Sequence, residues 1–105
     1  MLDEVQKLSP LSPAVMEHLQ KHYRLSNKEL RTACAAIEGL NAKEIANRCG
    51  LSTNTAKAQL KAVMKKINVN RANRLIIFAW QLEKYFSERA AKEAAEQNRL
   101  LFEAG

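Results

Sequence analysis

The sequence predicts an all-α fold, and three observations support this prediction. Only three Gly and two Pro interrupt the 105 residues; Ala, Leu, Lys and Glu are abundant; and there is no run of alternating β-branched residues. A chain of this length forms one domain with a modest core and leaves no room for a sensor or receiver domain beside it. We therefore expect one helical domain, with an appended element.

Two capping patterns mark the first two predicted helices. Ser12 stands before Pro13, where a hydroxyl can cap free amides and a proline fits the first helical position, so a short helix is expected over about 13–23. Ser26 opens an S-x-x-E capping box, and the next helix is expected over about 27–38. The expected buried stripe of this second helix is Leu30, Ala33, Cys34 and Ile37.

A glycine turn separates the next two predicted helices. Asn41 opens a second capping box and starts a helix that ends at about Arg48. Gly50 follows where the chain must turn sharply, because glycine takes a left-handed conformation without steric cost. Ser52 then caps a fourth helix, expected over about 53–66.

The fourth predicted helix separates its side chains onto two faces. The inward face is apolar and consists of Ala56, Leu60, Val63, Met64 and Ile67. The opposite face consists of Asn54, Lys57, Ala58, Lys61 and Lys65. Such a face suits the major groove of DNA, because lysine can meet phosphates or guanine acceptors and an alanine methyl can touch a thymine methyl. The side-chain amides of Asn54 and Gln59 can read adenine.

The excess positive charge lies in the same segment. Residues 40–74 carry eight basic groups against one acidic group, a balance of +7, whereas the flanking segments contribute zero and −1 to the chain's net +6. A local basic patch favours a polyanionic partner, because phosphate neutralisation releases condensed counterions. The alternative is a solvated charged face.

Helical pattern continues without Gly or Pro from about Arg71 to Phe102, with Asn70 as the expected cap. The first half carries an apolar stripe, and the second half degrades to alanines and charges, so a regular coiled coil is not expected. We predict that the apolar half completes the core and joins a dimer interface, whose residues are Leu75, Phe78, Trp80, Leu82, Tyr85 and Phe86. The alternative is a helix that packs back on its own domain.

These residues carry a family resemblance. The segment LSNKELRTACAAIEGLNAKEIANRCGLSTNTAKAQLKAVMKKINVNRANRL, from Leu25 to Leu75, resembles the helix-turn-helix domain of LuxR/NarL/GerE-type bacterial transcription regulators without a gap. The matching pieces are E-G-L at the end of one helix, A-K-E-I-A, the G-L-S turn, T-A-K and the K-K-I-x-V exit. The resemblance divides the chain into an arm with a short helix (1–24), the helix-turn-helix domain (25–75) and an extended C-terminal helix (76–105).

The resemblance implies a regulator that places its recognition helix in the major groove, usually as a dimer on paired half-sites. By position, Lys57, Ala58 and Lys61 are expected to face base edges, and Asn54 joins them from the residue chemistry above. The residues expected at the DNA backbone are Lys43, Thr55, Gln59, Lys65, Arg71 and Arg74.

The chain departs from the family pattern in several respects. Asn27 stands where the family often has a proline after the capping residue, and the acidic residue that the family often has near Arg74 is absent. Small residues, namely Thr32, Ala33 and Ala36, stand where larger aliphatics are common, so either the helices approach closely or another element fills the gap. The C-terminal helix is also longer than the family's usual last helix.

No signal for other chemistry is present. The sequence shows no phosphate-binding glycine loop and no nucleophile with a base at recognisable spacing, so we expect no enzyme, no catalytic residues and no cofactor. Cys34 and Cys49 are interpreted as small core residues, and His18 and His22 as surface residues with no metal. No apolar run can span a bilayer and no signal peptide is evident, so a cytoplasmic protein without membrane contact is expected. The initiating Met1 and the following arm favour a complete small protein.

The expected partners are double-stranded DNA and a second copy of the chain, with RNA polymerase or another regulator as further candidates. Two other functions stay open. The chain could be an interaction module that binds another regulator through the helix-turn-helix or the long helix, since it has no sensor domain of its own. It could also be the promoter-reading domain of a sigma factor, which shares the tri-helical shape.

Overall fold

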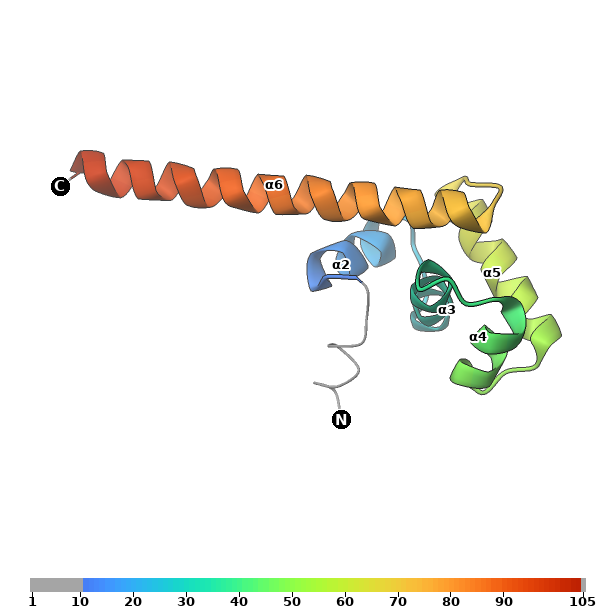
Figure 1. The fold of residues 1–105 in the computed structure, drawn as a ribbon. Helices are drawn as coiled ribbons and strands as arrows, with labels where there is room; N and C mark the ends of the chain where they lie inside the picture. Colours follow the sequence, from blue (N-terminus) through green and yellow to red (C-terminus); the bar gives the residue numbers. More distant parts are fainter. Residues whose placement is uncertain (1–10, 105) are drawn as a thin grey trace.

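The structure is a computed structural model that describes residues 11–104, with side chains described for residues 11–101. Within this part the chain forms five α-helices and no strand (Figure 1). They are α2 (Pro13–His22), α3 (Asn27–Ile37), α4 (Ala42–Cys49), α5 (Thr53–Ile67) and α6 (Ala72–Ala104). The predicted all-α class is confirmed, whereas most of the predicted N-terminal arm, residues 1–10, lies outside the described part. None of the described helices has the length and apolarity needed to cross a membrane.

Each of the four shorter helices begins with the side-chain cap that the sequence predicts. In each cap, the side-chain oxygen accepts a hydrogen bond from the backbone amide three residues later. The pairs are Ser12 with Val15 (3.3 Å), Ser26 with Glu29 (3.1 Å), Asn41 with Glu44 (2.9 Å) and Ser52 with Thr55 (3.1 Å). At Ser26 and Asn41 the cap amide also donates to the glutamate, so both capping boxes are complete.

The start of α6 differs from the prediction. The Leu75 N–H donates to the Arg71 carbonyl at 3.2 Å, which places Arg71 at the cap position, and the helix begins at Ala72. Asn70 therefore lies one residue before the cap, and its prediction as the cap is wrong. In the same linker, Asn68 ends α5 in a left-handed conformation (φ 67°, ψ 46°), which asparagine adopts more readily than most residues.

The centre of the domain is α3, which contacts α2, α4, α5 and α6. Its buried surface is wider than the predicted stripe, because Thr32 and Ala33 are fully buried and Ala35 and Ala36 are 2% and 3% exposed. Small side chains on several sides of a helix let its neighbours approach closely. Both extra elements, α2 and α6, cover α3, so the volume that larger aliphatics would occupy is filled by other helices.

The N-terminal helix is part of this core. Leu19 on α2 is 1% exposed. The Tyr23 ring meets the Phe78 ring of α6 edge-on, with centroids 5.5 Å apart. At the other end of α2, the Ser12 N–H donates to the Glu83 carboxylate at 2.7 Å. Two points of attachment therefore fix α2 along the first half of α6.

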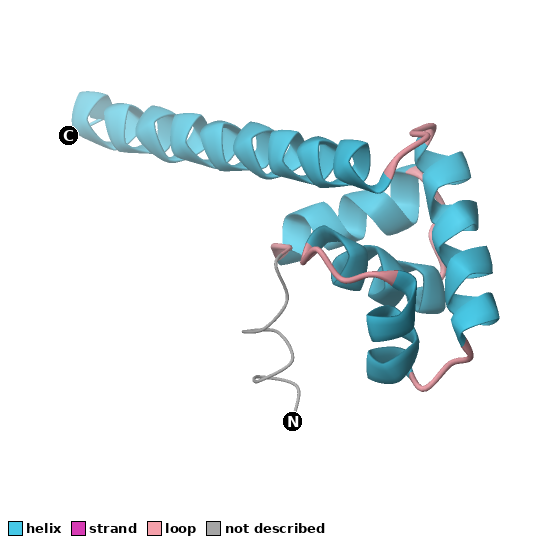
Figure 2. Cartoon of the chain, turned by 45° about the vertical axis from the view of Figure 1, so that its right-hand side comes forward, coloured by secondary structure: helices cyan, strands magenta, loops and turns pink. Residues whose placement is uncertain are grey.

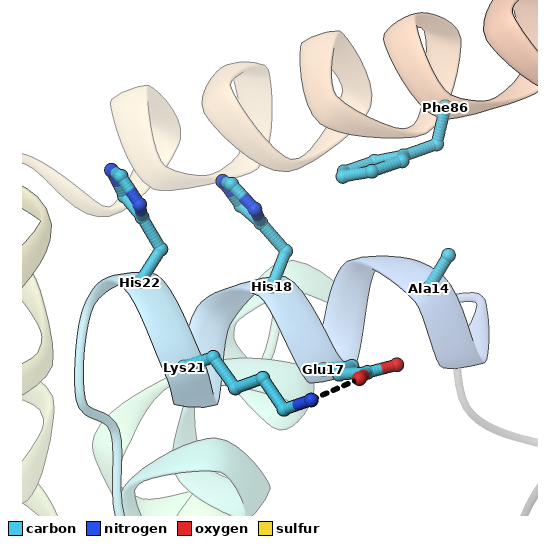
Figure 3. A pocket seen from close by; sticks show the side chains of 6 residues that line it. All are labelled: Ala14, Glu17, His18, Lys21, His22 and Phe86. Carbon is cyan, nitrogen blue, oxygen red and sulfur yellow. Dashed lines mark hydrogen bonds and ion pairs between the residues drawn. The ribbon is translucent and has the colours of Figure 1, made fainter.

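The two histidines of α2 lie at this seam. The His18 ring stacks on His22 with centroids 4.9 Å apart and meets the Phe86 ring of α6 edge-on at 5.3 Å (Figure 3). His18 is half-buried, so its prediction as a surface residue is wrong, whereas His22 is exposed. Burial and, second, the nearby His22 lower the pKa of His18. Among the described residues there is no group of three or more side chains that could hold a metal ion.

Beyond Phe86, α6 leaves the domain. Every residue from 87 to 101 is exposed, and the helix extends past α2 as a straight rod (Figures 1 and 2). Of the three ion pairs that the spacing of four predicts here, Arg89 with Glu93 forms at 3.3 Å, and neither Lys84 nor Lys92 pairs with Glu88 within the described residues. Surface pairs of this kind stabilise a helix only weakly, by roughly 0.2–0.5 kcal/mol each. The rod is therefore a helix that lacks a packing partner within the described chain.

Candidate nucleic-acid interface

A left-handed glycine fixes the angle between α4 and α5. Gly50 ends α4 with φ 67° and ψ 37°, and its N–H donates to the Ala46 carbonyl. The Leu51 N–H donates to the same carbonyl at 2.9 Å, which closes the turn before Ser52 caps α5. The two helices then pack on each other, and α5 lies along the outer edge of the domain (Figure 2).

The two predicted faces of α5 are confirmed. On the inner face, Ala56 and Val63 are fully buried and Ile67 is 6% exposed, while Leu60 and Met64 are half-buried. The exposed residues of the outer face are Asn54, Lys57, Ala58, Lys61 and Lys65. Burial of the inner face on α3 and α4 therefore aims the outer face at solvent.

The basic side chains of the segment divide into two groups. Arg48 pairs with Glu38, and Lys66 pairs with Glu29 at 2.7 Å and donates to the Arg24 carbonyl at 3.0 Å. The hydrogen bond from Lys66, followed by that from the Ser26 amide, lowers the pKa of Glu29. The others, Lys43, Lys57, Lys61, Lys65, Arg71 and Arg74, are exposed and form no ion pair within the described residues. These six cations are the ones that the sequence assigned to DNA.

Apart from Gln59, the residues expected at the DNA backbone lie around the outer face of α5 or beyond its end. Lys43 is exposed in the first turn of α4. The exposed Thr55 hydroxyl accepts a hydrogen bond from Ser52 Oγ at 2.8 Å and keeps its own proton for another acceptor. Beyond the other end of α5, Arg74 lines a shallow hollow together with the two linker asparagines.

Gln59 differs from the other residues expected at the DNA backbone, because part of its side chain faces the core. Its side chain is half-buried, and its Oε1 accepts a hydrogen bond from the Thr32 hydroxyl of α3 at 2.8 Å. Thr32 is fully buried, so this bond satisfies a polar group inside the core. Its carboxamide therefore joins α5 to α3, and the contact of Gln59 with the DNA backbone stays a prediction.

The predicted dimer residues of α6 also divide. Leu75 is 1% exposed, and Phe78, Leu82 and Phe86 pack against the core of the same chain. These four pack in the domain's own core, as expected of an apolar half that completes the core, because α2 and α3 cover that face of α6. Of the six, only Trp80 and Tyr85 are exposed, at 64% and 54%.

The structure also reveals residues that the sequence reasoning did not select. Ile77 is 56% exposed and Leu101 is 72% exposed, although both are large and apolar. The signal in the sequence was that α6 carries apolar residues on two sides. Only one of these sides can face the domain, so the other must be exposed. Lys66 was counted with the basic segment, and no local pattern showed that Glu29, far away in the sequence, would bind it.

Comparison with known protein families shows which family contains this arrangement of helices. The GerE family model, described as bacterial regulatory proteins of the luxR family, matches residues 23–79, more than half of the chain. The match spans α3, α4, α5 and the first turns of α6, and so contains the whole outer face of α5. Comparisons with curated proteins and with solved structures found no match. The chain contains a DNA-binding helix-turn-helix domain and belongs to the luxR family of bacterial regulatory proteins.

Proposed function

We propose that this protein is a sequence-specific regulator of transcription that inserts α5 into the major groove of double-stranded DNA. One observation carries the proposal: the outer face of α5 presents exposed cations that have no ion-pair partner in the described chain, at the centre of the family match. Unpaired cations on one helix face are a binding surface for phosphates and for the acceptors of guanine.

The size and shape of α5 fit this role. Its 15 residues extend over about 22 Å, and an α-helix about 10–12 Å across fits a groove about 12 Å wide. Ala58 and Thr55 are small, so the helix backbone can approach the base edges closely. Lys57, Lys61 and Asn54 then donate hydrogen bonds to the bases, and Ala58 meets a thymine methyl.

Flanking cations hold the helix in register. Lys43 on α4 reaches the phosphates beside the start of α5, and Lys65, Arg71 and Arg74 reach those beside its end. Thr55 donates its hydroxyl proton to a phosphate oxygen at the first turn of α5. Contacts of this kind position a protein on DNA and add affinity without selecting sequence.

Selection of bound duplexes from a random pool tests the proposal, followed by affinity measurements on the selected duplex. Lys57→Ala is expected to weaken specific binding by about 1–3 kcal/mol and to relax the preference at one base position. Lys92→Ala is the matched control, because it removes the same charge from an exposed position far from α5. Selection that yields no preferred sequence, or equal losses in the two variants, would contradict base reading by α5.

We further propose that the protein binds as a homodimer on paired half-sites. Support comes from the exposed part of α6, which is long, helical and carries large apolar side chains without a partner in the described chain. A pair of related motifs in the selected duplexes is the expected result, because the symmetry of a dimer appears in its operator.

A second candidate function is an interaction module for another regulator or for RNA polymerase. The same exposed end of α6 favours it, because a solvated rod is also a surface for a foreign helix. Binding to random duplex DNA at low salt distinguishes the two functions. A DNA-binding regulator binds the duplex under these conditions, and an interaction module does not.

A further inference from the structure

One face of α6 has the spacing of a helix pair but has no partner in the described chain. Eight residues recur alternately three and four positions apart, and all eight are exposed. We call them the outer stripe: Ile77, Trp80, Lys84, Ser87, Ala91, Ala94, Asn98 and Leu101. The stripe that packs on α2 and α3 contains Leu75, Ala79 and Leu82 and lies on the opposite side of the helix.

We propose that the outer stripe pairs with the outer stripe of a second copy of this chain, with the two α6 helices antiparallel. This inference deepens the dimer within the proposed function by assigning its surface and its direction. The large side chains stand at the two ends of the stripe, and small ones occupy its middle. An antiparallel pair centred at residue 89 places Ile77 opposite Leu101 of the second copy and Ser87 opposite Ala91. Large side chains then pack together at both ends of the contact, and small side chains let the two helices approach closely at its middle.

The charges of α6 favour the antiparallel direction. In a parallel pair, Lys84 would face Lys84 of the second copy inside the contact, and like charges repel. In the antiparallel pair Lys84 faces Ala94, and the two Glu88 side chains near the symmetry axis are the like charges that approach. The stripe also gives Trp80 a partner, because its indole N–H can donate to the side-chain oxygen of Asn98.

The remaining charges of the rod stay in water in such a pair. Arg89 pairs with Glu93 at 3.3 Å and donates to the Tyr85 hydroxyl at 3.2 Å, and Arg99 pairs with Glu96 at 2.5 Å. All five lie outside the outer stripe, at the solvent positions of the same heptad pattern. Because each domain lies on the inner side of its own α6, two chains can pair without contact between their domains (Figure 1).

Two readouts on the whole protein test whether the pair forms. The stripe spans about 36 Å, and a contact of this size is expected to dissociate in the range of about 1–100 μM. Sedimentation should therefore show monomer and dimer in exchange over that range. Trp80 is the only tryptophan of the chain and is 64% exposed, so its emission should shift to shorter wavelength with the same midpoint. A monomer with unchanged emission throughout would overturn the proposal.

Two neighbouring leucines provide a matched pair of variants. Leu101 belongs to the outer stripe, and Leu100, 53% exposed, does not. Leu101→Glu should raise the dissociation constant by about tenfold or more, while Leu100→Glu, with the same change in charge and size, should leave it nearly unchanged. Both positions are exposed, so neither change disturbs the domain core, and circular dichroism checks that each variant stays helical. Equal effects of the two changes would exclude the outer stripe as the contact.

A charge at position 94 tests the direction of pairing. In the antiparallel pair, Ala94→Glu places a carboxylate opposite Lys84 of the second copy and should tighten the dimer by about 2- to 10-fold, and Ala94→Lys should weaken it. In a parallel pair, Ala94→Glu would place two carboxylates face to face and weaken the dimer, a result that would overturn the proposed direction. None of these measurements uses DNA, so a protein that dimerises as described but binds no duplex would refute the proposed function alone.

Discussion

Lys65 and Lys66 are neighbours on α5 but have different roles, because an acceptor lies within reach of only one of them. Lys65 is exposed and without an ion pair in the described chain, whereas Lys66 holds Glu29 and the Arg24 carbonyl. Arg24 has a left-handed backbone (φ 58°), which is unfavourable for a side chain of its size. Lys66 therefore ties the turn between α2 and α3 to the end of α5, and it contributes to stability rather than to DNA binding.

Lys66→Ala is accordingly expected to lower the free energy of unfolding by about 0.5–1 kcal/mol near neutral pH. The native pKa of Glu29 lies below its ordinary value of 4.5, so its contribution is fully present above that value and is lost as pH falls through the native pKa. The difference between the two proteins should therefore shrink in acid. Urea unfolding at a series of pH values measures it, and Lys65→Ala, which should have little effect on stability, is the control.

His18 makes the stability of the fold depend on pH at higher pH values than Glu29 does. Its pKa is lowered by burial at the seam of α2 and α6 and by His22 beside it, so the unfolded chain takes up protons at a higher pH than the folded one. Stability is then fully present above the ordinary pKa of 6.5 and declines as pH falls below it. We expect His18→Gln to flatten this decline between about pH 7.5 and pH 5.5, measured by urea unfolding. An unchanged slope would show that titration of His18 does not cause the decline in stability.

At the scale of the element, α3 determines how closely the helices pack. Ala33 is fully buried at the centre of the domain, where α3 is covered by α2, α4, α5 and α6. Ala33→Leu should therefore overpack the core and lower the free energy of unfolding by about 1–3 kcal/mol, although leucine is an excellent helix former. Ala90→Leu, at an exposed position of α6, should change stability by less than about 0.5 kcal/mol. Thermal or urea unfolding of the two variants separates packing from helix propensity.

The sequence predicted the helices well because the signals that start and end them are local. A cap and its amide are three residues apart, and Gly50 acts within one turn, so Ser26, Asn41 and Ser52 mark real helix starts. The prediction of Asn70 as the cap of α6 was wrong by one residue, because the helix starts one residue later and Arg71 occupies the cap position. Such a shift depends on how α6 packs, which no local pattern encodes.

At the scale of the whole molecule, the basic residues act as a group on the phosphates of DNA. Each phosphate that a cation neutralises contributes about 0.9 to the slope of log affinity against log salt, so Lys43, Lys65, Arg71 and Arg74 together predict a slope of about 4 × −0.9 = −3.6 per chain. A dimer bound through both chains should show about twice that slope. Titrations of random duplex at several salt concentrations measure it, and a slope near zero would exclude phosphate binding by this surface.

The sequence by itself determined the helical class, the start of each shorter helix, the two faces of α5 and the family to which the chain belongs. All of these follow from periodicity, caps and motifs within a few helical turns. The tertiary structure decided which stripe of α6 enters the core, that Gln59 bonds to Thr32, that Lys66 holds Glu29 and that His18 lies in a seam. Each of these depends on residues far apart in the chain, whose meeting is set by helix packing. The six exposed cations of the basic segment needed both the sequence, which grouped them, and the fold, in which they form no ion pair within the described residues.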